Sequence, residues 1–228
     1  MKVAEVFASI QGEGLLAGVP SLFIRSSGCN LRCVWCDTPY TSWAPEGENW
    51  PVERLELWAG GHDRYRHVVI TGGEPMIQPE LPALTRALAA RGFHITIETA
   101  GTVWAGVECQ LMSLSPKLAN STPHERESGV WAARHDELRY SPAVLRRLMA
   151  AHPYQLKYVV AEEGDLDEIL AQVTELHAER ERVLLMPEGT EASHLRERGR
   201  WVVELCQRYG FRFCPRLHVE LWGSRRGV

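Results

Sequence analysis

The chain has 228 residues, with 29 Asp and Glu against 25 Lys and Arg, and a formal net charge of −4. This slight acidity excludes general electrostatic attraction to nucleic acid, which needs clustered Lys and Arg. Hydrophobic residues make up 45% of the chain, which is enough to bury a core, yet no apolar run approaches the ~20 residues of a membrane span. Residues 1–7 contain an early acid and no long apolar stretch, so we expect a cytoplasmic protein without a signal peptide.

Short apolar runs that are typical of β-strands occur throughout the chain. We expect strands at Val3–Phe7, Leu22–Arg25, Val68–Thr71, Phe93–Glu98, Leu111–Leu114, Gln155–Val160, Val183–Met186 and Phe211–Phe213. Several of these runs are almost continuously apolar, which is the pattern of parallel strands covered on both faces.

Helical patterns separate the later strands. We expect helices at Leu81–Arg91, Pro142–Ala151, Asp165–Ala178 and Glu191–Tyr209. Glycines follow the first and the last of these, and Ser141 with Pro142 forms a favourable helix start. Because strands alternate with helices over most of the chain, the sequence predicts an α/β fold built from right-handed crossover units.

Two segments interrupt this alternation. Pro39–Arg66 is rich in Pro, Gly and Trp, whereas Ala119–Leu138 is polar with scattered His, Glu and Arg. Connections of this length are uncommon unless they are functional or disordered. We interpret both as insertions in one domain spanning residues 1–228, and each could be a lid, a partner surface or a variable surface loop.

Three of the six cysteines, Cys29, Cys33 and Cys36, lie within eight residues directly after an expected strand. Cytosolic thiols are kept reduced, so metal or catalytic chemistry is favoured over disulfides. Soft thiolates bind zinc, copper or an iron–sulfur cluster. The sequence lacks the second closely spaced ligand pair of a zinc finger, and an ordinary four-iron cluster takes four cysteines.

Three thiolates therefore predict an iron–sulfur cluster with one iron left open for a ligand. The alternative is a structural zinc site that uses a distant Cys or His as its fourth ligand. We expect the remaining cysteines to be small buried hydrophobic residues; they are Cys109, Cys206 and Cys214.

The spacing Cys-x3-Cys-x2-Cys resembles the motif of radical S-adenosylmethionine (SAM) enzymes. The resemblance implies a shortened, incomplete (β/α) barrel and a 4Fe–4S cluster held by Cys29, Cys33 and Cys36. In such enzymes the open iron chelates the amino and carboxylate groups of SAM, and the reduced cluster cleaves the sulfonium to give a 5′-deoxyadenosyl radical.

Other motifs occur in order over nearly the whole chain. They are Ser9–Gly14 (SIQGEG), Arg25, residues 36–38 (CDT), Thr71–Pro75 (TGGEP), Ile97–Thr102 (IETAGT), residues 115–117 (SPK) and Leu217–Gly223 (LHVELWG). Together they resemble the 7-carboxy-7-deazaguanine synthase family of queuosine and deazapurine biosynthesis. The resemblance implies a carbon–nitrogen lyase that converts 6-carboxy-5,6,7,8-tetrahydropterin to 7-carboxy-7-deazaguanine by radical ring contraction with loss of ammonia.

The implied substrate has a carboxylate at one end and a guanidine-like pyrimidine edge at the other. Arg25 offers a rigid donor fork for the carboxylate, and ionised Glu13 accepts hydrogen bonds from amino and ring N–H groups. A surface salt bridge for Arg25 and a turn acid for Glu13 are the alternatives. The resemblance adds five further substrate contacts, from Ile10, Gln11, Gly12, Thr71 and His218.

The resemblance also implies the residues that contact SAM. They are Trp35, Cys36, Asp37, Gly73, Glu74, Ser115, Pro116, Lys117, Met186, Pro187, Glu188 and Gly189. Many of them follow expected strands, where α/β folds bind ligands. We expect Glu74 to accept hydrogen bonds from the SAM ammonium and Lys117 to neutralise the SAM carboxylate.

Thr38 is implied to be the protein ligand of an Mg²⁺ ion that orients the substrate carboxylate. Mg²⁺ keeps several waters and takes few protein ligands, so one hydroxyl plus substrate oxygens is a plausible set. A helix or turn cap is the alternative role for this threonine. No residue is assigned as a general base.

The resemblance further implies an electron donor such as flavodoxin and a homodimer. Trp43, Trp50 and Trp58 in the first insertion are candidates for covering apolar surface. One alternative function is a radical SAM activase that acts on a protein, which should lack the pair Glu13 and Arg25. The other is a non-catalytic iron–sulfur or zinc module, which should neither bind nor cleave SAM.

Overall fold

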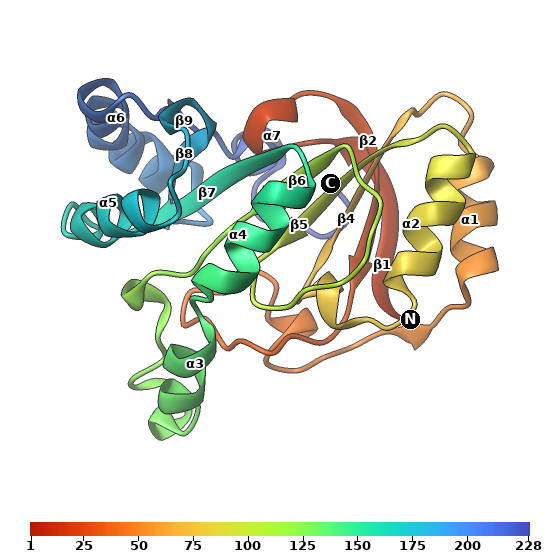
Figure 1. The fold of residues 1–228 in the computed structure, drawn as a ribbon, viewed down its shortest axis with the longest axis horizontal. Helices are drawn as coiled ribbons and strands as arrows, with labels where there is room; N and C mark the ends of the chain where they lie inside the picture. Colours follow the sequence, from red (N-terminus) through yellow and green to blue (C-terminus); the bar gives the residue numbers. More distant parts are fainter.

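The computed structural model describes residues 1–228 and contains one nine-stranded sheet in the order β3-β1-β2-β4-β5-β6-β7-β8-β9 (Figure 1). Its strands are β1 (Lys2–Ile10), β2 (Pro20–Ser26), β3 (Glu48–Asn49), β4 (His67–Gly72), β5 (His94–Thr99), β6 (Leu111–Leu114), β7 (Tyr154–Val160), β8 (Val183–Pro187) and β9 (Arg212–Phe213). In the run β2-β4-β5-β6-β7-β8-β9, every pair of neighbouring strands is parallel. The predicted α/β class is confirmed, and every expected strand is present.

Seven α-helices accompany the sheet. They are α1 (Val52–Gly60), α2 (Leu81–Ala90), α3 (Ala132–Leu138), α4 (Pro142–Ala151), α5 (Asp165–Glu175), α6 (Ala192–Tyr209) and α7 (Leu217–Trp222). The four expected helices are present, but α5 ends three residues early, because His177 adopts a φ of 52° that a helix cannot continue through. None of the helices is both long and apolar enough to cross a lipid bilayer.

The insertions contain regular structure that the sequence did not predict. Pro39–Arg66 includes the edge strand β3 and helix α1, and Ala119–Leu138 includes α3. The antiparallel pairing of β1 with both β2 and β3 was also not predicted. Both α3 and α7 have seven residues or fewer, so they are too short to give a clear helical period.

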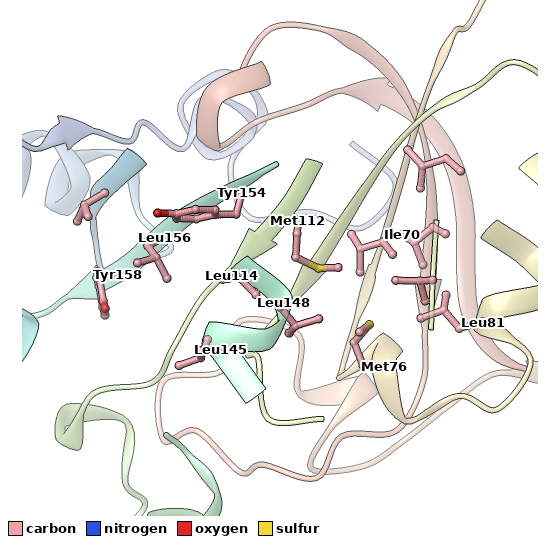
Figure 2. Close-up of a cluster of buried hydrophobic side chains, with 14 of the residues drawn as sticks. Ile70, Met76, Leu81, Met112, Leu114, Leu145, Leu148, Tyr154, Leu156 and Tyr158 are labelled. Carbon is pink, nitrogen blue, oxygen red and sulfur yellow. The ribbon is translucent and has the colours of Figure 1, made fainter. Parts of the chain in front are cut away.

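The two faces of the sheet differ in chemistry. The outer face carries a continuous apolar layer under the helices; Figure 2 shows part of it, with Leu145 and Leu148 of α4 beside Leu114 of β6. Because side chains alternate along a strand, the neighbouring positions point the other way. These inner positions include Arg25, Thr71, Glu98, Ser113 and Lys157. The barrel interior is therefore polar and can bind a polar ligand.

Hydrogen bonds between strands do not close the barrel, because β3 and β9 are its two free edges. The connection after β1 and the helix α7 meet across the interior instead (Figure 1). The Leu217 amide donates to the Gly12 carbonyl at 2.9 Å, and the Leu15 amide donates to Gln155 Oε1 at 2.8 Å. A Cβ at Gly12 would lie 2.0 Å from His218 Nδ1, so this close approach requires glycine. The prediction of an incomplete (β/α) barrel is confirmed.

Candidate active site

Two adjoining cavities, of about 750 and 790 Å³, occupy the barrel interior and the carboxyl ends of the parallel strands. They share wall residues from the connection after β1, the cysteine loop, β4 and β5, namely Glu13, Asp37, Thr71 and Glu98. Ligands bound in the two cavities would therefore lie next to each other. We refer to them as the polar cavity and the cysteine cavity.

All seven substrate-binding candidates line the polar cavity: Ile10, Gln11, Gly12, Glu13, Arg25, Thr71 and His218. The proposed magnesium ligand Thr38 lines it as well. Val228 lines it too, and the sequence interpretation missed the other lining residues, which are Phe7, Phe23, Tyr40, Glu98, Arg216, Ser224 and Arg225. Residues from both ends of the chain thus converge on this cavity.

Glu13 is held between two buried cations. Lys157 of β7 donates to its Oε2, and Arg216 Nε donates to its Oε1 at 3.1 Å. Burial by itself raises the pKa of Glu13, but the charges of Lys157 and Arg216 outweigh it and hold that pKa well below its usual range. The carboxylate is therefore ionised and can only accept hydrogen bonds. This environment does not fit the alternative of an exposed turn acid.

Arg216 joins three parts of the site. Besides Glu13, its guanidinium donates to Asp37 Oδ2 in the cysteine loop and to the Gly189 carbonyl after β8. Its side chain is only 6% exposed. Burial lowers the pKa of Arg216, but Glu13 and Asp37 raise it beyond its usual value. The arginine is a permanent positive link between the polar cavity and the cysteine loop.

Arg25 is oriented by a neighbour on β1. Its Nε donates to Glu5 Oε1 at 2.7 Å, and the Tyr40 hydroxyl donates to the same oxygen at 2.8 Å. This pairing uses Nε and leaves the two terminal nitrogens of the guanidinium for a ligand. The rings of Phe7 and Phe23 stack beside it with centroids 4.8 Å apart. Arg25 thus has a salt bridge, as the alternative supposed, but within the wall of the cavity.

Cys29, Cys33 and Cys36 all line the cysteine cavity. Burial raises the pKa values of Cys29 and Cys33 to about 12, so their thiols are protonated until a metal displaces the protons. No three His, Cys, Asp or Glu side chains are arranged to hold a single metal ion. Three soft sulfur donors on one wall of a roomy cavity fit an iron–sulfur cluster with an open corner.

The other three cysteines do not line the cysteine cavity. Cys206 is buried in the main core, as predicted, whereas Cys109 is half-buried and packs against that core. Cys214 is buried and its sulfur accepts a hydrogen bond from the Gly14 amide at 3.1 Å.

Most of the SAM candidates surround the same cavity. Seven line it directly: Trp35, Cys36, Asp37, Gly73, Ser115, Lys117 and Met186. Pro187, Glu188 and Gly189 line a smaller cavity of about 290 Å³ that also borders Trp35 and Met186. The Glu188 side chain pairs with Arg198 of α6. Pro116 is buried and does not reach either lining.

Glu74 lies next to the lining of the cysteine cavity, between Gly73 and the residues Thr99 and Ala100, without being part of that lining. Its carboxylate is fully buried and accepts from the Met76 amide at 3.0 Å, the Thr99 hydroxyl at 2.6 Å and the Ala100 amide at 2.8 Å. The side chain caps the short 3-10 helix Pro75–Ile77 by accepting from the Met76 amide. Glu74 thereby fixes Thr99 and Ala100, which line the cysteine cavity, and its contact with the SAM ammonium stays a prediction.

Lys157 and Arg216 are the main residues that sequence reasoning missed. Lys157 had a detectable signal, because Gln155 and Lys157 alternate with apolar residues in an otherwise apolar strand. Polar residues two apart in such a strand point to one face, which here is the barrel interior. Arg216 lies in the irregular segment before α7 and had no comparable signal.

Comparison with known proteins agrees with this geometry. Residues 23–111 match a family model described as the radical SAM superfamily. The chain is 43% identical to "7-carboxy-7-deazaguanine synthase" of Halobacterium salinarum, over 98% of this chain and 91% of that protein. It is 42% identical to the protein of the same name from Rhodopirellula baltica, over 99% of this chain and 88% of that protein. A crystal structure of QueE from Escherichia coli superimposes with a TM-score of 0.68, 28% identity, and coverage of 93% and 92%.

The incomplete barrel and the three-cysteine cavity, together with these matches, make the protein a radical SAM enzyme, a class that uses a 4Fe–4S cluster and SAM. Within that superfamily, the chain belongs to the 7-carboxy-7-deazaguanine synthase family. The family predicted from the sequence motifs is thereby confirmed. The comparisons favour it over an activase and over a non-catalytic iron–sulfur or zinc module.

Replacing a cysteine of the loop should remove the cluster. Anaerobically reconstituted wild-type protein should hold about four irons per chain, and Cys33→Ala should hold almost none because two thiolates remain. Iron analysis and the visible absorption of the cluster measure this. Cys109→Ala is the matched control, and loss of the cluster in that variant would contradict the assignment.

Proposed function

We propose that the protein converts 6-carboxy-5,6,7,8-tetrahydropterin to 7-carboxy-7-deazaguanine with release of ammonia, as a carbon–nitrogen lyase of queuosine and deazapurine biosynthesis. One observation carries the assignment: all seven residues that the family motifs imply for the substrate line a single cavity, and that cavity adjoins the three cysteines. The names of the relatives support the same product.

The polar cavity suits the two ends of this substrate. Glu13, kept ionised by Lys157 and Arg216, accepts hydrogen bonds from the amino and ring N–H groups of the pterin. Arg25 binds the carboxylate through its terminal nitrogens, since Glu5 already fixes its Nε. Anchoring both ends holds the ring system beside the cysteine cavity.

The cysteine cavity suits the cofactors. Cys29, Cys33 and Cys36 would hold the 4Fe–4S cluster, which together with SAM would supply a radical able to remove hydrogen from C6 of the substrate. Lys117, fixed by the Ser115 carbonyl and hydroxyl at 2.8 and 2.9 Å, neutralises the SAM carboxylate. Trp35 and the 186–189 loop border the rest of the cofactor.

Mg²⁺ completes the proposal, with Thr38 as its protein ligand. The Thr38 side chain lines the polar cavity together with Arg25 and Tyr40. A single hydroxyl, substrate oxygens and waters satisfy the octahedral preference of this ion. Thr38 and Arg25 then act on one carboxylate by coordination and by charge, respectively.

We also propose that the 228 residues act as one domain in the cytoplasm, accept electrons from a carrier such as flavodoxin, and form a homodimer. All six cysteines are free thiols, which suits a reducing compartment. In the first insertion, Trp43, Trp50 and Trp58 are half-buried. Leu57 is the large apolar side chain of this insertion that is exposed, with 68% of its surface accessible to solvent. Light scattering should give a dimer at micromolar concentration, and a monomer would contradict the assembly alone.

The activity itself is tested with anaerobically reconstituted protein, SAM, dithionite and the carboxypterin. We expect 7-carboxy-7-deazaguanine and ammonia in equal amounts, detected by mass spectrometry and an ammonia assay. Glu13→Gln should lower kcat/KM by one to two decades, because hydrogen bonds to a charged group contribute about 1.5–3 kcal/mol. A protein that cleaves SAM but releases no deazapurine would overturn the proposal and point to the activase.

Arg25 and Thr38 should respond differently to Mg²⁺. Arg25→Ala should weaken substrate binding at every Mg²⁺ concentration, by about one to two decades. Thr38→Ala should instead raise the Mg²⁺ concentration needed for activity while SAM binding and the cluster stay intact. Because both residues act on one carboxylate, the two effects should not add in the double variant.

Activity titrated against Mg²⁺ measures these effects. Thr38→Ser keeps the hydroxyl and serves as the matched control, so it should titrate close to wild type. If Thr38→Ala needs no more Mg²⁺ than wild type, the threonine is a turn residue and the ion binds elsewhere.

A further inference from the structure

The second insertion, Ala119–Leu138, contacts the cysteine loop along its length. The Val34 amide donates to the Ser121 carbonyl at 2.8 Å, and Trp35 Nε1 donates to Asn120 Oδ1 at 3.1 Å. The Arg32 amide donates to His135 Nδ1 at 3.1 Å. Figure 1 shows α3, which carries His135, standing apart from the helices that cover the sheet. No residue of α3 belongs to the main core; the helix is tied to the cysteine loop through His135 and to the rest of its own insertion through His135 and Asp136.

The hydrogen bonds of His135 define its tautomer. A backbone amide can only donate, so Nδ1 must accept from Arg32, and the ring proton then resides on Nε2. Nε2 lies 2.8 Å from the Ser121 hydroxyl, which in turn donates to the Leu118 carbonyl at 2.6 Å. The side chain is 1% exposed, and burial lowers the pKa of His135 to about 4. The ring is therefore neutral near pH 7, and its Nδ1 lone pair is available to Arg32.

The bond to Arg32 falls in the middle of the loop. Arg32 immediately precedes Cys33 and is three residues after Cys29. The Arg32 guanidinium also lies 4.6 Å from the centre of the Trp131 ring, so the insertion holds both the backbone and the side chain of this residue. A fixed peptide at this position limits the orientations of the two neighbouring thiols.

We propose that His135 is a positioning residue for the cysteine loop. By accepting a hydrogen bond from the Arg32 amide, it preorganises the backbone between Cys29 and Cys33 for the cluster. The inference rests on the proposed cluster ligands but concerns a residue outside them. It gives the second insertion a role in cofactor retention. Preorganised ligands lose less conformational entropy when they bind, so the cluster is retained more firmly.

Two substitutions separate this role from simple packing. His135→Asn places an amide oxygen close to the position of Nδ1 and keeps the acceptor for Arg32, whereas His135→Gln reaches the position of Nε2 and loses it. Both are neutral and polar. His124, which is exposed in the same insertion, provides the control variant His124→Gln. Thermal unfolding of each apo-protein checks that the variants are folded.

The first readout does not need the cluster. In the full-length apo-protein, the Arg32 amide should exchange with deuterium about three- to tenfold faster in His135→Gln, as expected for one lost hydrogen bond. His135→Asn and His124→Gln should exchange at nearly the wild-type rate. Equal rates in wild type and His135→Gln would overturn the inference, as would equally fast exchange in the Asn and Gln variants.

The second readout uses the reconstituted protein. Cluster loss to an iron chelator should be about three- to tenfold faster in His135→Gln and close to wild type in His135→Asn. An unchanged rate in His135→Gln overturns the inference while leaving the proposed function intact. A cluster that persists in Cys33→Ala overturns the proposed ligands instead, so the two failures are distinguishable.

Discussion

The site depends on one charge network, in which the largely buried Arg216 lies between Glu13 and the exposed Asp37 while Lys157 holds Glu13 from the other side. Burying these groups singly would be costly, because an unpaired charge loses its hydration. As a set they compensate one another and fix three loops and one strand relative to each other. Although burial alone raises the pKa of Glu13, Lys157 and Arg216 hold it well below its usual range, so the carboxylate that faces the polar cavity is ionised.

The two faces of the sheet have different roles, because side chains alternate between them along each strand. Adjacent residues such as Ile97 and Glu98, or Leu156 and Lys157, point to opposite sides, so each strand contributes to the core and to the cavity at once. The apolar face packs against the helices and provides the stability. The polar face is left free for chemistry, which a closed apolar barrel interior would not allow.

The strands and the four long helices could be predicted, because apolar runs and helical periods are local in the sequence. Helices α1, α3 and α7 could not, since they are short or lie in irregular segments and are held by tertiary contacts. Most of the site residues that were predicted from sequence motifs line the two cavities of the structure. The hydrogen bonds that Glu74 accepts from Met76, Thr99 and Ala100 could not be predicted because they depend on local backbone geometry, and Arg216 was missed because its partners are distant in sequence.

The charge network also sets the order in which the site can be completed. Glu13 and Arg216 are 203 residues apart, and Asp37 and Arg216 are 179 apart. The strands of the barrel pair with neighbours that are close in sequence, so they can form while the chain is still emerging from the ribosome. The polar cavity has no wall on the Arg216 and His218 side until these two residues have left the ribosome. The binding pocket therefore forms after most of the barrel can already have folded.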